Sequence, residues 1–369
     1  MADPIPDPST VRIMSGTAWE QFCDDLKDAG KHILAETSPD DPFDRAEGYR
    51  YLTRLTRAAL ESFVEGADPL APELRRTAHE TVKMGADNPD NYYMSAPISG
   101  SHEYRVSGTR GTVHYLGFGT QAGNYGATGS LATTGYLEAA DMDVTPDGSF
   151  EILVSAKRQE GNWLRMAPDS SSLIVRQTFL DRGTERLADL RIERIDGAHA
   201  ARHLTPRVID RGLAASAKFV GGCAKLFSMW ANSMKAHTNE LPRFDAAVAK
   251  AAGGDPNIVY HHSYWELAGD EALVIESPVP ECDYWNFQLN NHWMESLDYR
   301  YFPISLNKHS AKSGPDGNVT LVVSAVNPGV DNWIDTCGHA RGTMCWRWIR
   351  AEEPPVPTTR VVNVDSLRS

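Results

Sequence analysis

Basic residues and long apolar runs are scarce in this 369-residue chain, and each shortage limits the partners it can have. Lysine and arginine number 36 against 49 aspartates and glutamates, which gives a formal net charge of -13 at pH 7. Nucleic acids and anionic membranes bind basic surfaces, so we expect neither as a partner. No apolar run approaches the roughly 18 residues that span a bilayer.

Cysteine is scarce as well, because the chain has five, an odd number whose spacing matches no zinc motif. Residues 1–8 show neither the basic nor the apolar region of a signal peptide, so we predict a cytoplasmic protein. The glycines from Gly117 to Gly135 lack the Lys-Ser/Thr of a P-loop. The histidines lack a recognised metal-ligand spacing. The sequence therefore predicts no metal and leaves any cofactor unknown.

An internal repeat is the clearest feature that the chain does contain. Residues 146–156 and 315–325 lie 169 positions apart and are identical at six of eleven positions, where chance gives about one. One-residue slips of this offset align Asn162-Trp163 with Asn332-Trp333, and Arg176 with Arg347. The second copy carries charged and polar residues where the first has glycine and alanine, so we expect the chemistry in the second copy.

Helical patterns occupy two parts of the chain. Residues 17–36 begin with a match to a capping box. Asp41 and Pro42 supply the N-cap and the first position of a second helix. Residues 206–236 carry an apolar stripe at helical spacing, and the pair Gly221-Gly222 could kink or divide that helix.

Strand patterns follow each helical part. Alternating runs bounded by Gly, Pro and Asp predict strands at 104–107, 111–118, 149–156 and 172–179. Helices and strands in this order predict an α+β protein with two homologous antiparallel β-sandwich or jelly-roll-like units, each preceded by helical segments. The pattern leaves open whether the units share one sheet or form separate sandwiches. The predicted organisation is a loose arm at 1–16, a helical segment at 17–90, a first β-rich repeat at 91–200, a helical connector at 201–252, a second β-rich repeat at 253–352 and a C-terminal tail at 353–369.

The motifs of the two copies form similar series. The first copy has Asp147-Gly148, then 161–164, then a strand ending in Arg176. The second copy has 284–289, Asp316-Gly317, Asn332-Trp333 and Arg347. These motifs resemble those of a known family, domain of unknown function 1214. Residues 45–52 are similar to the N-terminal extension of its longer members, so the resemblance covers roughly 45–350. It implies a β-rich, jelly-roll-like fold, no established activity and no catalytic residue.

One predicted strand of the second copy has a polar face. Side chains alternate along a strand, which places Tyr284, Asn286, Gln288, Asn290 and His292 together on one side. The equivalent face of the first copy has glycine at Gly117 and Gly119. One polar wall opposite one wall without side chains is typical of a ligand cavity, so we predict substrate-binding roles for Tyr284, Asn286, Gln288, Asn290, Gly117 and Gly119. The alternative is a strand that merely faces solvent.

Ionisable residues follow this strand closely. His292 is the best candidate for a general base, with Glu295 or Asp298 to orient it. His309 and His339 complete the predicted catalytic set, and Cys337 beside His339 is a weaker candidate for a nucleophile. Three cations could hold an oxyanion, namely Arg300, Lys308 and Arg341. The competing interpretation is structural, with Asp298 and Arg300 forming a surface ion pair.

These features predict an enzyme that acts on a small, partly apolar organic molecule by acid–base chemistry, as a hydrolase or lyase. The alternative is a non-catalytic module that binds a small molecule or carbohydrate, or assembles with other subunits. Self-association into a homo-oligomer also stays open. Convergence of the predicted catalytic residues in one enclosed pocket would favour the enzyme, and their scatter would favour the binding or assembly module.

Overall fold

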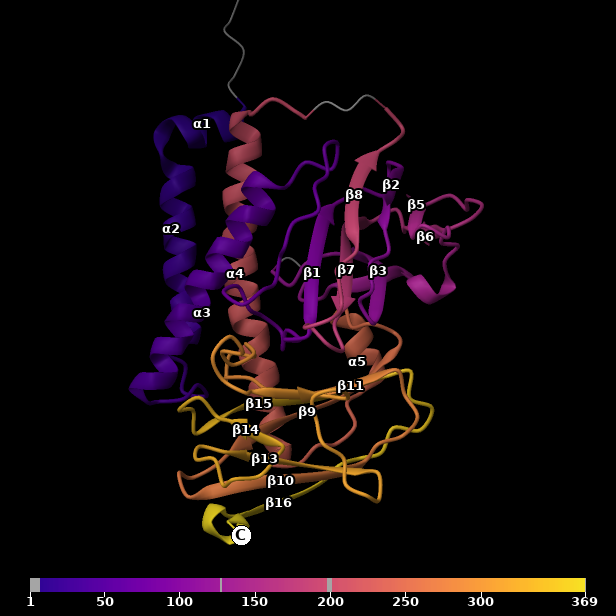
Figure 1. The fold of residues 1–369 in the computed structure, drawn as a ribbon. Helices are drawn as coiled ribbons and strands as arrows, with labels where there is room; N and C mark the ends of the chain where they lie inside the picture. The colour runs from indigo at the N-terminus through magenta and orange to yellow at the C-terminus, as the bar shows by residue number, and fades with distance from the viewer. Residues whose placement is uncertain (1–6, 127, 198–200, 369) are drawn as a thin grey trace, which may run out of the picture.

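The computed structural model describes residues 7–126, 128–197 and 201–368. It is an α+β fold in which a layer of helices lies beside one β unit, with a second β unit packed beneath both (Figure 1). Among the described residues, no helix has the length and apolar character needed to cross a membrane.

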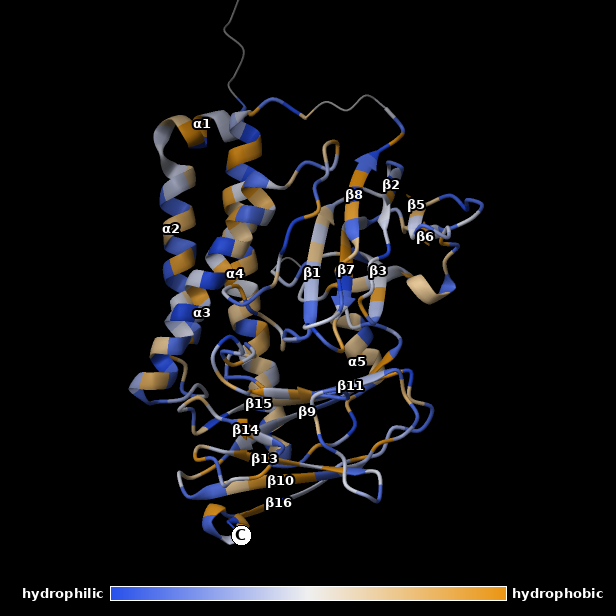
Figure 2. Ribbon diagram, in the orientation of Figure 1, coloured by the Kyte–Doolittle hydropathy of each residue, from blue (hydrophilic) through white to orange (hydrophobic). Residues whose placement is uncertain are grey.

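The helical layer is built on α4, against which α1, α2 and α3 all pack. Its buried residues form one stripe along the helix, and Figure 2 shows apolar positions along much of its length. Gly221 and Gly222 do not divide it, since one α-helix runs through both residues. The helices are α1 Pro8–Ser15, α2 Thr17–Ala29, η1 Gly30–His32, α3 Pro42–Leu60, η2 Glu61–Glu65, η3 Ala139–Asp141, α4 Pro206–Met234, η4 Lys235–His237, α5 Ala246–Ala251 and η5 Val364–Leu367.

Helix starts follow the predicted caps in one place and depart from them in another. Asp41 accepts hydrogen bonds from the backbone N–H groups of Phe43 and Asp44, as its predicted N-cap role requires. The capping box predicted from Thr17 does not form, because Gly16 occupies the N-cap position.

Residues 8–15 form helix α1 and are not the loose arm expected for residues 1–16, of which 1–6 lie outside the described part. Pro8 suits the first turn of a helix. Arg12 bonds Asp210 of α4 at 2.9 Å, and Ile13 packs against the cluster that contains Leu213. These contacts fix the segment on α4.

Each β unit consists of two four-stranded sheets. In the first unit the strand orders are β1-β7-β3-β4 and β6-β5-β2-β8; in the second they are β9-β15-β11-β12 and β14-β13-β10-β16. The first unit has β1 Asn91–Pro97, β2 Tyr104–Thr109, β3 Tyr115–Ala122, β4 Ala132–Glu138, β5 Ser149–Ser155, β6 Trp163–Arg165, β7 Ser170–Thr178 and β8 Asp189–Arg194. The second has β9 Ile258–Glu266, β10 Glu271–Pro278, β11 Tyr284–Leu289, β12 Ser305–Asn307, β13 Asn318–Ser324, β14 Trp333–Asp335, β15 Arg341–Ile349 and β16 Thr358–Asn363.

The two units repeat each other in strand order and in register. Val106 pairs with Ile152 in the first unit, and Ile275 pairs with Leu321 in the second, both at the 169-residue offset. The internal repeat is therefore a repeat of structure, and the units form separate pairs of sheets. Strand β16 belongs to the second unit, although its residues lie in the predicted tail.

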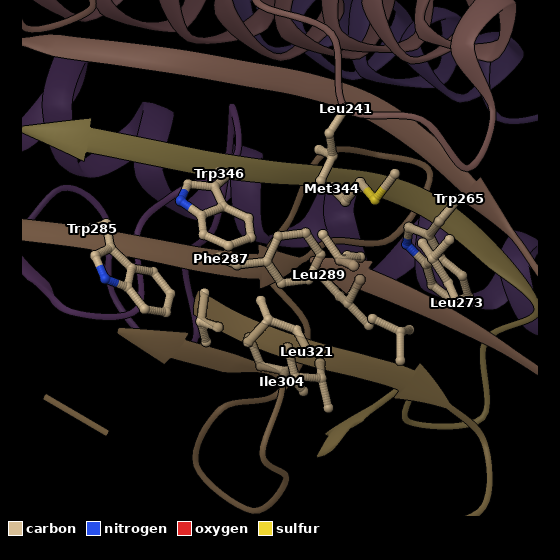
Figure 3. Packing of buried hydrophobic residues seen from close by; sticks show 14 of the residues in the cluster. Leu241, Trp265, Leu273, Trp285, Phe287, Leu289, Ile304, Leu321, Met344 and Trp346 are labelled. Atoms are coloured by element: carbon tan, nitrogen blue, oxygen red, sulfur yellow. The ribbon is translucent and has the colours of Figure 1, made fainter. Parts of the chain in front are cut away.

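Each unit has its own apolar core. Trp285, Phe287 and Leu289 point into the core of the second unit, with Trp346 beside Phe287 (Figure 3). The predicted alternation of β11 is thus confirmed. The indoles of the repeated Asn-Trp pairs are half-buried in both units. The Nε1 of Trp163 donates to the Ser155 carbonyl at 3.2 Å, and that of Trp333 to the Ser324 carbonyl at 3.1 Å.

Candidate functional site

A cavity of about 460 Å³ lies where the helical layer meets both β units. Its wall combines an apolar part and a polar part, as small-molecule sites commonly do. The apolar part includes Phe63, Met84, Phe219, Trp230 and Phe244. The polar part includes Tyr93, Arg176, Tyr260, His262 and Arg347.

Two arginines of the polar part stand at equivalent positions in the two repeats. Arg176 on β7 pairs with Tyr93 on β1, and Arg347 on β15 pairs with Tyr260 on β9. Each repeat therefore contributes one arginine and one tyrosine to the same cavity.

The two arginines hold the repeats together by reciprocal contacts. Arg176 of the first repeat donates from Nη2 to the carbonyl of Gly253, just before β9, at 2.6 Å. Arg347 of the second repeat donates from Nη2 to the carbonyl of Ala86, just before β1. Ala86 and Gly253 both stand seven residues before the paired tyrosine and both have left-handed backbone, with φ of 57° and 80°. Each unit thus anchors the arginine of the other.

The surroundings of the two arginines differ in charge. Asp255 lies near Arg176, and although burial opposes the charged form, attraction to this carboxylate raises the pKa of the guanidinium. The equivalent residue beside Arg347 is Asn88, which is neutral. Arg347 instead donates from Nη1 to the amide oxygens of Asn286 and Gln288.

Neither guanidinium has a carboxylate oxygen within 4.0 Å in the part of the chain that the structure describes. Within the same described residues, Nε of Arg347 and both Nε and Nη1 of Arg176 make no hydrogen bond. These unpartnered nitrogens are not fully buried, so they are accessible from the cavity. Arginine stays charged in proteins, and the site therefore presents free cationic donors.

His262 adds an uncharged group to this wall. Its ring stacks on Tyr260 at a centroid distance of 5.6 Å, and its Nε2 lies 3.8 Å from the sulfur of Cys345. Burial, followed by the charge of Arg347, lowers the pKa of His262 to about 3. The imidazole is therefore neutral near pH 7. Across the described ranges, no group of three or more His, Cys, Asp or Glu residues is placed to hold a metal ion.

The predicted polar face of β11 lies inside the protein and does not line the cavity itself. Tyr284, Asn286, Gln288 and Asn290 are all fully buried. The first three contact the segment before β1; for example, Gln288 donates to the carbonyl of Asp87 at 2.8 Å. Asn290 instead bonds Gln288 and Thr343. Asn286 and Gln288 reach the cavity only through Arg347, which they hold.

The two predicted glycines give room to other side chains. A Cβ on Gly117 would lie 2.5 Å from the hydroxyl of Tyr136, and one on Gly119 would lie 3.2 Å from Cγ2 of Ile174. Neither glycine is among the cavity-lining residues. Their space is therefore taken by neighbouring side chains of the first repeat.

His292 is fully buried away from the cavity wall. Its Nδ1 lies 3.0 Å from the hydroxyl of Tyr264. Burial, with smaller effects from Lys235 and Arg341, lowers the pKa of His292 to about 3. An imidazole with so low a pKa is a weak base.

His339 and Arg341 come together around one buried carboxylate, Asp44 of α3. The distances are 3.5 Å from Nδ1 of His339 and 4.0 Å from Nε of Arg341. Asp44 precedes the repeats by many residues, so no pattern in the sequence indicated this cluster.

The other predicted residues lie apart. Glu295 is buried in an ion pair with Arg54 at 2.7 Å. Asp298 pairs with Arg300 at 2.7 Å near the surface, as the competing structural interpretation expects. The side chain of His309 is mostly exposed. Lys308 donates from Nζ to the carbonyl of Cys282 at 2.5 Å.

The five predicted catalytic residues do not converge on the cavity, and their catalytic roles stay a prediction. The residues missed as site candidates are Tyr93, Arg176, Tyr260, His262 and Arg347. One signal could have found the arginines. Both repeats place an arginine at the same point of the strand, directly after three apolar residues at 173–175 and 344–346, where a charged side chain is costly unless it has a partner or a function.

The comparisons with known proteins give relatives but no activity. No family model matches the chain, and no curated protein matches it. The crystal structure of an uncharacterized protein from Burkholderia cenocepacia is 54% identical, with a TM-score of 0.95, and the match covers 96% of this chain and 99% of that one. The VPA0106 protein from Vibrio parahaemolyticus is 13% identical, with a TM-score of 0.50 over 86% of this chain and 98% of that one. The second likeness concerns the fold alone.

Proposed function

This chain belongs to the same family as the uncharacterized Burkholderia cenocepacia protein, and we propose that it binds a small organic anion with an apolar body in the cavity between its two β units. The observation that carries the proposal is the pair of arginines at equivalent positions, with accessible nitrogens and no ion-paired carboxylate among the described residues. An anionic ligand would supply the missing counter-charge through charge-assisted hydrogen bonds.

The apolar wall defines the rest of the ligand. Aromatic side chains and Met84 surround the space beside the arginines, and burial of apolar surface stabilises a complex by roughly 25 cal/mol per Å². A volume of about 460 Å³ is in the range of small-molecule sites. The ligand we propose therefore joins one acidic group to a hydrocarbon chain or ring.

The cavity favours the binding alternative over the predicted hydrolase or lyase. None of the five predicted catalytic residues lines it. The imidazole that does, His262, has a pKa lowered to about 3 by burial and by Arg347, which makes it a weak base near neutral pH. The membership of domain of unknown function 1214 that the motifs suggest stays a prediction.

We also propose a cytoplasmic location. All five cysteines are free thiols in the structure, and three of them are buried. Unpaired cysteines suit a reducing compartment. Fractionation of cells that express the tagged chain would test this proposal, and recovery outside the cytoplasm would contradict it.

Isothermal titration calorimetry with three acids, phenylacetate, hexanoate and octanoate, tests the binding proposal. Each acid is compared with its primary amide, which has nearly the same shape and no charge. We expect at least one acid to bind more tightly than its amide. Arg347→Met should weaken the binding of that acid about tenfold to a hundredfold, because hydrogen bonds to charged groups contribute about 1.5–3 kcal/mol.

Arg211→Met is the matched control, since Arg211 is an exposed arginine of α4 outside the cavity. Its affinity for the same acid should equal that of the wild type. The proposal fails if no acid binds, or if acids bind equally well to the wild type and to Arg347→Met.

A further inference from the structure

The two cavity tyrosines have the same hydrogen bonding in both repeats. The Tyr93 hydroxyl oxygen accepts the backbone N–H of Asn88 at 3.0 Å, and the Tyr260 oxygen accepts that of Asp255 at 3.3 Å. Both donors lie five residues before their tyrosine. Neither hydroxyl proton has an acceptor within the described ranges, so each remains available to a ligand.

The hydroxyl protons are retained at neutral pH. Burial raises the pKa of Tyr93, and burial likewise raises that of Tyr260. Each repeat therefore presents the same two donors to the cavity, one tyrosine hydroxyl and one guanidinium.

The carboxylate of Asp255 at this end of the cavity is already occupied by donors. The Oδ2 of Asp255 accepts from the hydroxyls of Tyr115 at 2.9 Å and Tyr136 at 2.8 Å, and its Oδ1 accepts from the backbone of Asn257. The tyrosine hydroxyls and guanidinium groups that remain free are donors, so a ligand group that only accepts hydrogen bonds would match them.

A ligand with a single negative charge would balance the net charge of the site. Two guanidinium groups and the nearby Asp255 leave one net positive charge, because His262 is neutral near pH 7 and the buried Asp90 is attracted more strongly to Arg182 than to Arg347. The remaining carboxylates of the wall have other cations nearby: Asp87 has Lys83, Glu61 pairs with Arg57, and Glu73 pairs with Arg75. A phosphate monoester would carry about 1.5 to 2 negative charges at neutral pH.

We propose that the acidic group of the ligand is a carboxylate, with one oxygen bound by Tyr93 and Arg347 and the other by Tyr260 and Arg176, because each tyrosine hydroxyl lies beside the backbone that anchors the arginine of the other unit. This inference rests on the proposed binding function. A carboxylate has two equivalent oxygens, as the site has two equivalent donor pairs. It also carries one charge and only accepts hydrogen bonds. Tyr93 and Tyr260 are then specificity-determining residues with matching roles.

The test compares acids that share one carbon skeleton. Phenylacetate is measured against benzylphosphonate and phenylmethanesulfonate, and hexanoate and octanoate against their phosphonate and sulfonate counterparts, by calorimetry on the full chain. The phosphonates change charge and shape, whereas the sulfonates keep one charge and add a third oxygen. We expect each carboxylate that binds to be at least fivefold tighter than both counterparts.

The variants Tyr93→Phe and Tyr260→Phe each remove one hydroxyl and keep the ring. We expect each to weaken the best carboxylate about five- to tenfold, by similar factors, and the double variant to multiply the two effects. Binding of the matching primary amide should change less than twofold. Tyr49→Phe, on an exposed tyrosine of α3, is the control and should leave affinity unchanged. Melting temperatures confirm that every variant is folded.

The outcomes separate this inference from the function on which it rests. Binding that depends on Arg347 but is unchanged in both tyrosine variants overturns the inference alone. So does a phosphonate or sulfonate that binds as tightly as its carboxylate, or an effect confined to Tyr260. Absence of any binding that depends on Arg347 overturns both proposals.

Discussion

Arg347 shows how single residues decide the properties of this site. Its strand is otherwise almost entirely apolar, from Met344 to Ile349, and a charged group there is tolerated only with compensation. Asn286, Gln288 and the Ala86 carbonyl provide dipoles but no counter-charge. The sequence predicted that this face of β11 is polar and functional. It could not show that these amides act through an arginine on the neighbouring strand, because strand pairing is not visible in the sequence.

The buried His292 leads to a prediction about how the free energy of unfolding depends on pH. Burial lowers its pKa in the folded state to about 3, whereas an unfolded histidine titrates near 6.5. As pH falls below about 6.5, the unfolded chain gains a proton that the folded chain does not, which lowers the free energy of unfolding. The stability contributed by the neutral His292 is therefore complete above about pH 6.5 and is lost as the pH falls toward 3. We expect His292→Phe to reduce the pH dependence of the unfolding free energy by up to about 1.4 kcal/mol per pH unit.

Urea unfolding of wild type and variant at about pH 7, 6 and 5 measures this difference, and the window avoids most carboxylate titration. His309→Phe serves as the control, because that side chain is mostly exposed. An equal slope in His292→Phe and wild type would contradict the assignment.

At the scale of elements, the sequence predicted the strands with clear alternation and missed those without it. Strands β2, β3, β5 and β7 were expected from alternating apolar residues. Strand β1 was missed, and β9 was expected only as part of the second β-rich repeat, because adjacent aromatic or histidine residues such as Tyr92-Tyr93 and His261-His262 obscure the alternation. Those two strands carry the cavity tyrosines. The cavity could therefore not be located, although the repeat and the fold class could.

Helix α4 offers a matched pair of substitutions at adjacent glycines. A Cβ on Gly222 would lie 2.4 Å from the Cα of Gly126, whereas one on Gly221 would meet nothing within 4 Å. We expect Gly221→Ala to raise the free energy of unfolding by about 0.5–1 kcal/mol through helix propensity. Gly222→Ala should lower it by about 1–3 kcal/mol through overpacking. Thermal unfolding measures both, and equal effects would show that the contact with Gly126 is unimportant.

At the scale of the whole molecule, the reciprocal contacts of Arg176 and Arg347 join the two units. We expect one cooperative unfolding transition, since neither arginine can keep its backbone acceptor if the other unit unfolds. Tryptophan fluorescence reports mainly on the second unit and its junction with the helices, where six of the nine tryptophans lie. Far-ultraviolet circular dichroism reports on the whole chain. Urea curves from the two probes should coincide, and separate midpoints would show that the units unfold independently.

The reciprocal anchoring of the two arginines also affects how far the sequences of the two halves can diverge. One unit alone cannot satisfy its own arginine, because the carbonyl that the arginine needs belongs to the other unit. Two identical chains could meet this need only as a symmetric dimer, and every substitution would then occur twice. A single chain removes that constraint. One half can hold its arginine with Asn286 and Gln288, while the other has Gly117 and Gly119 at the same places and keeps a carboxylate nearby. The tandem arrangement would thus allow a symmetric framework to bind the asymmetric ligand that we propose.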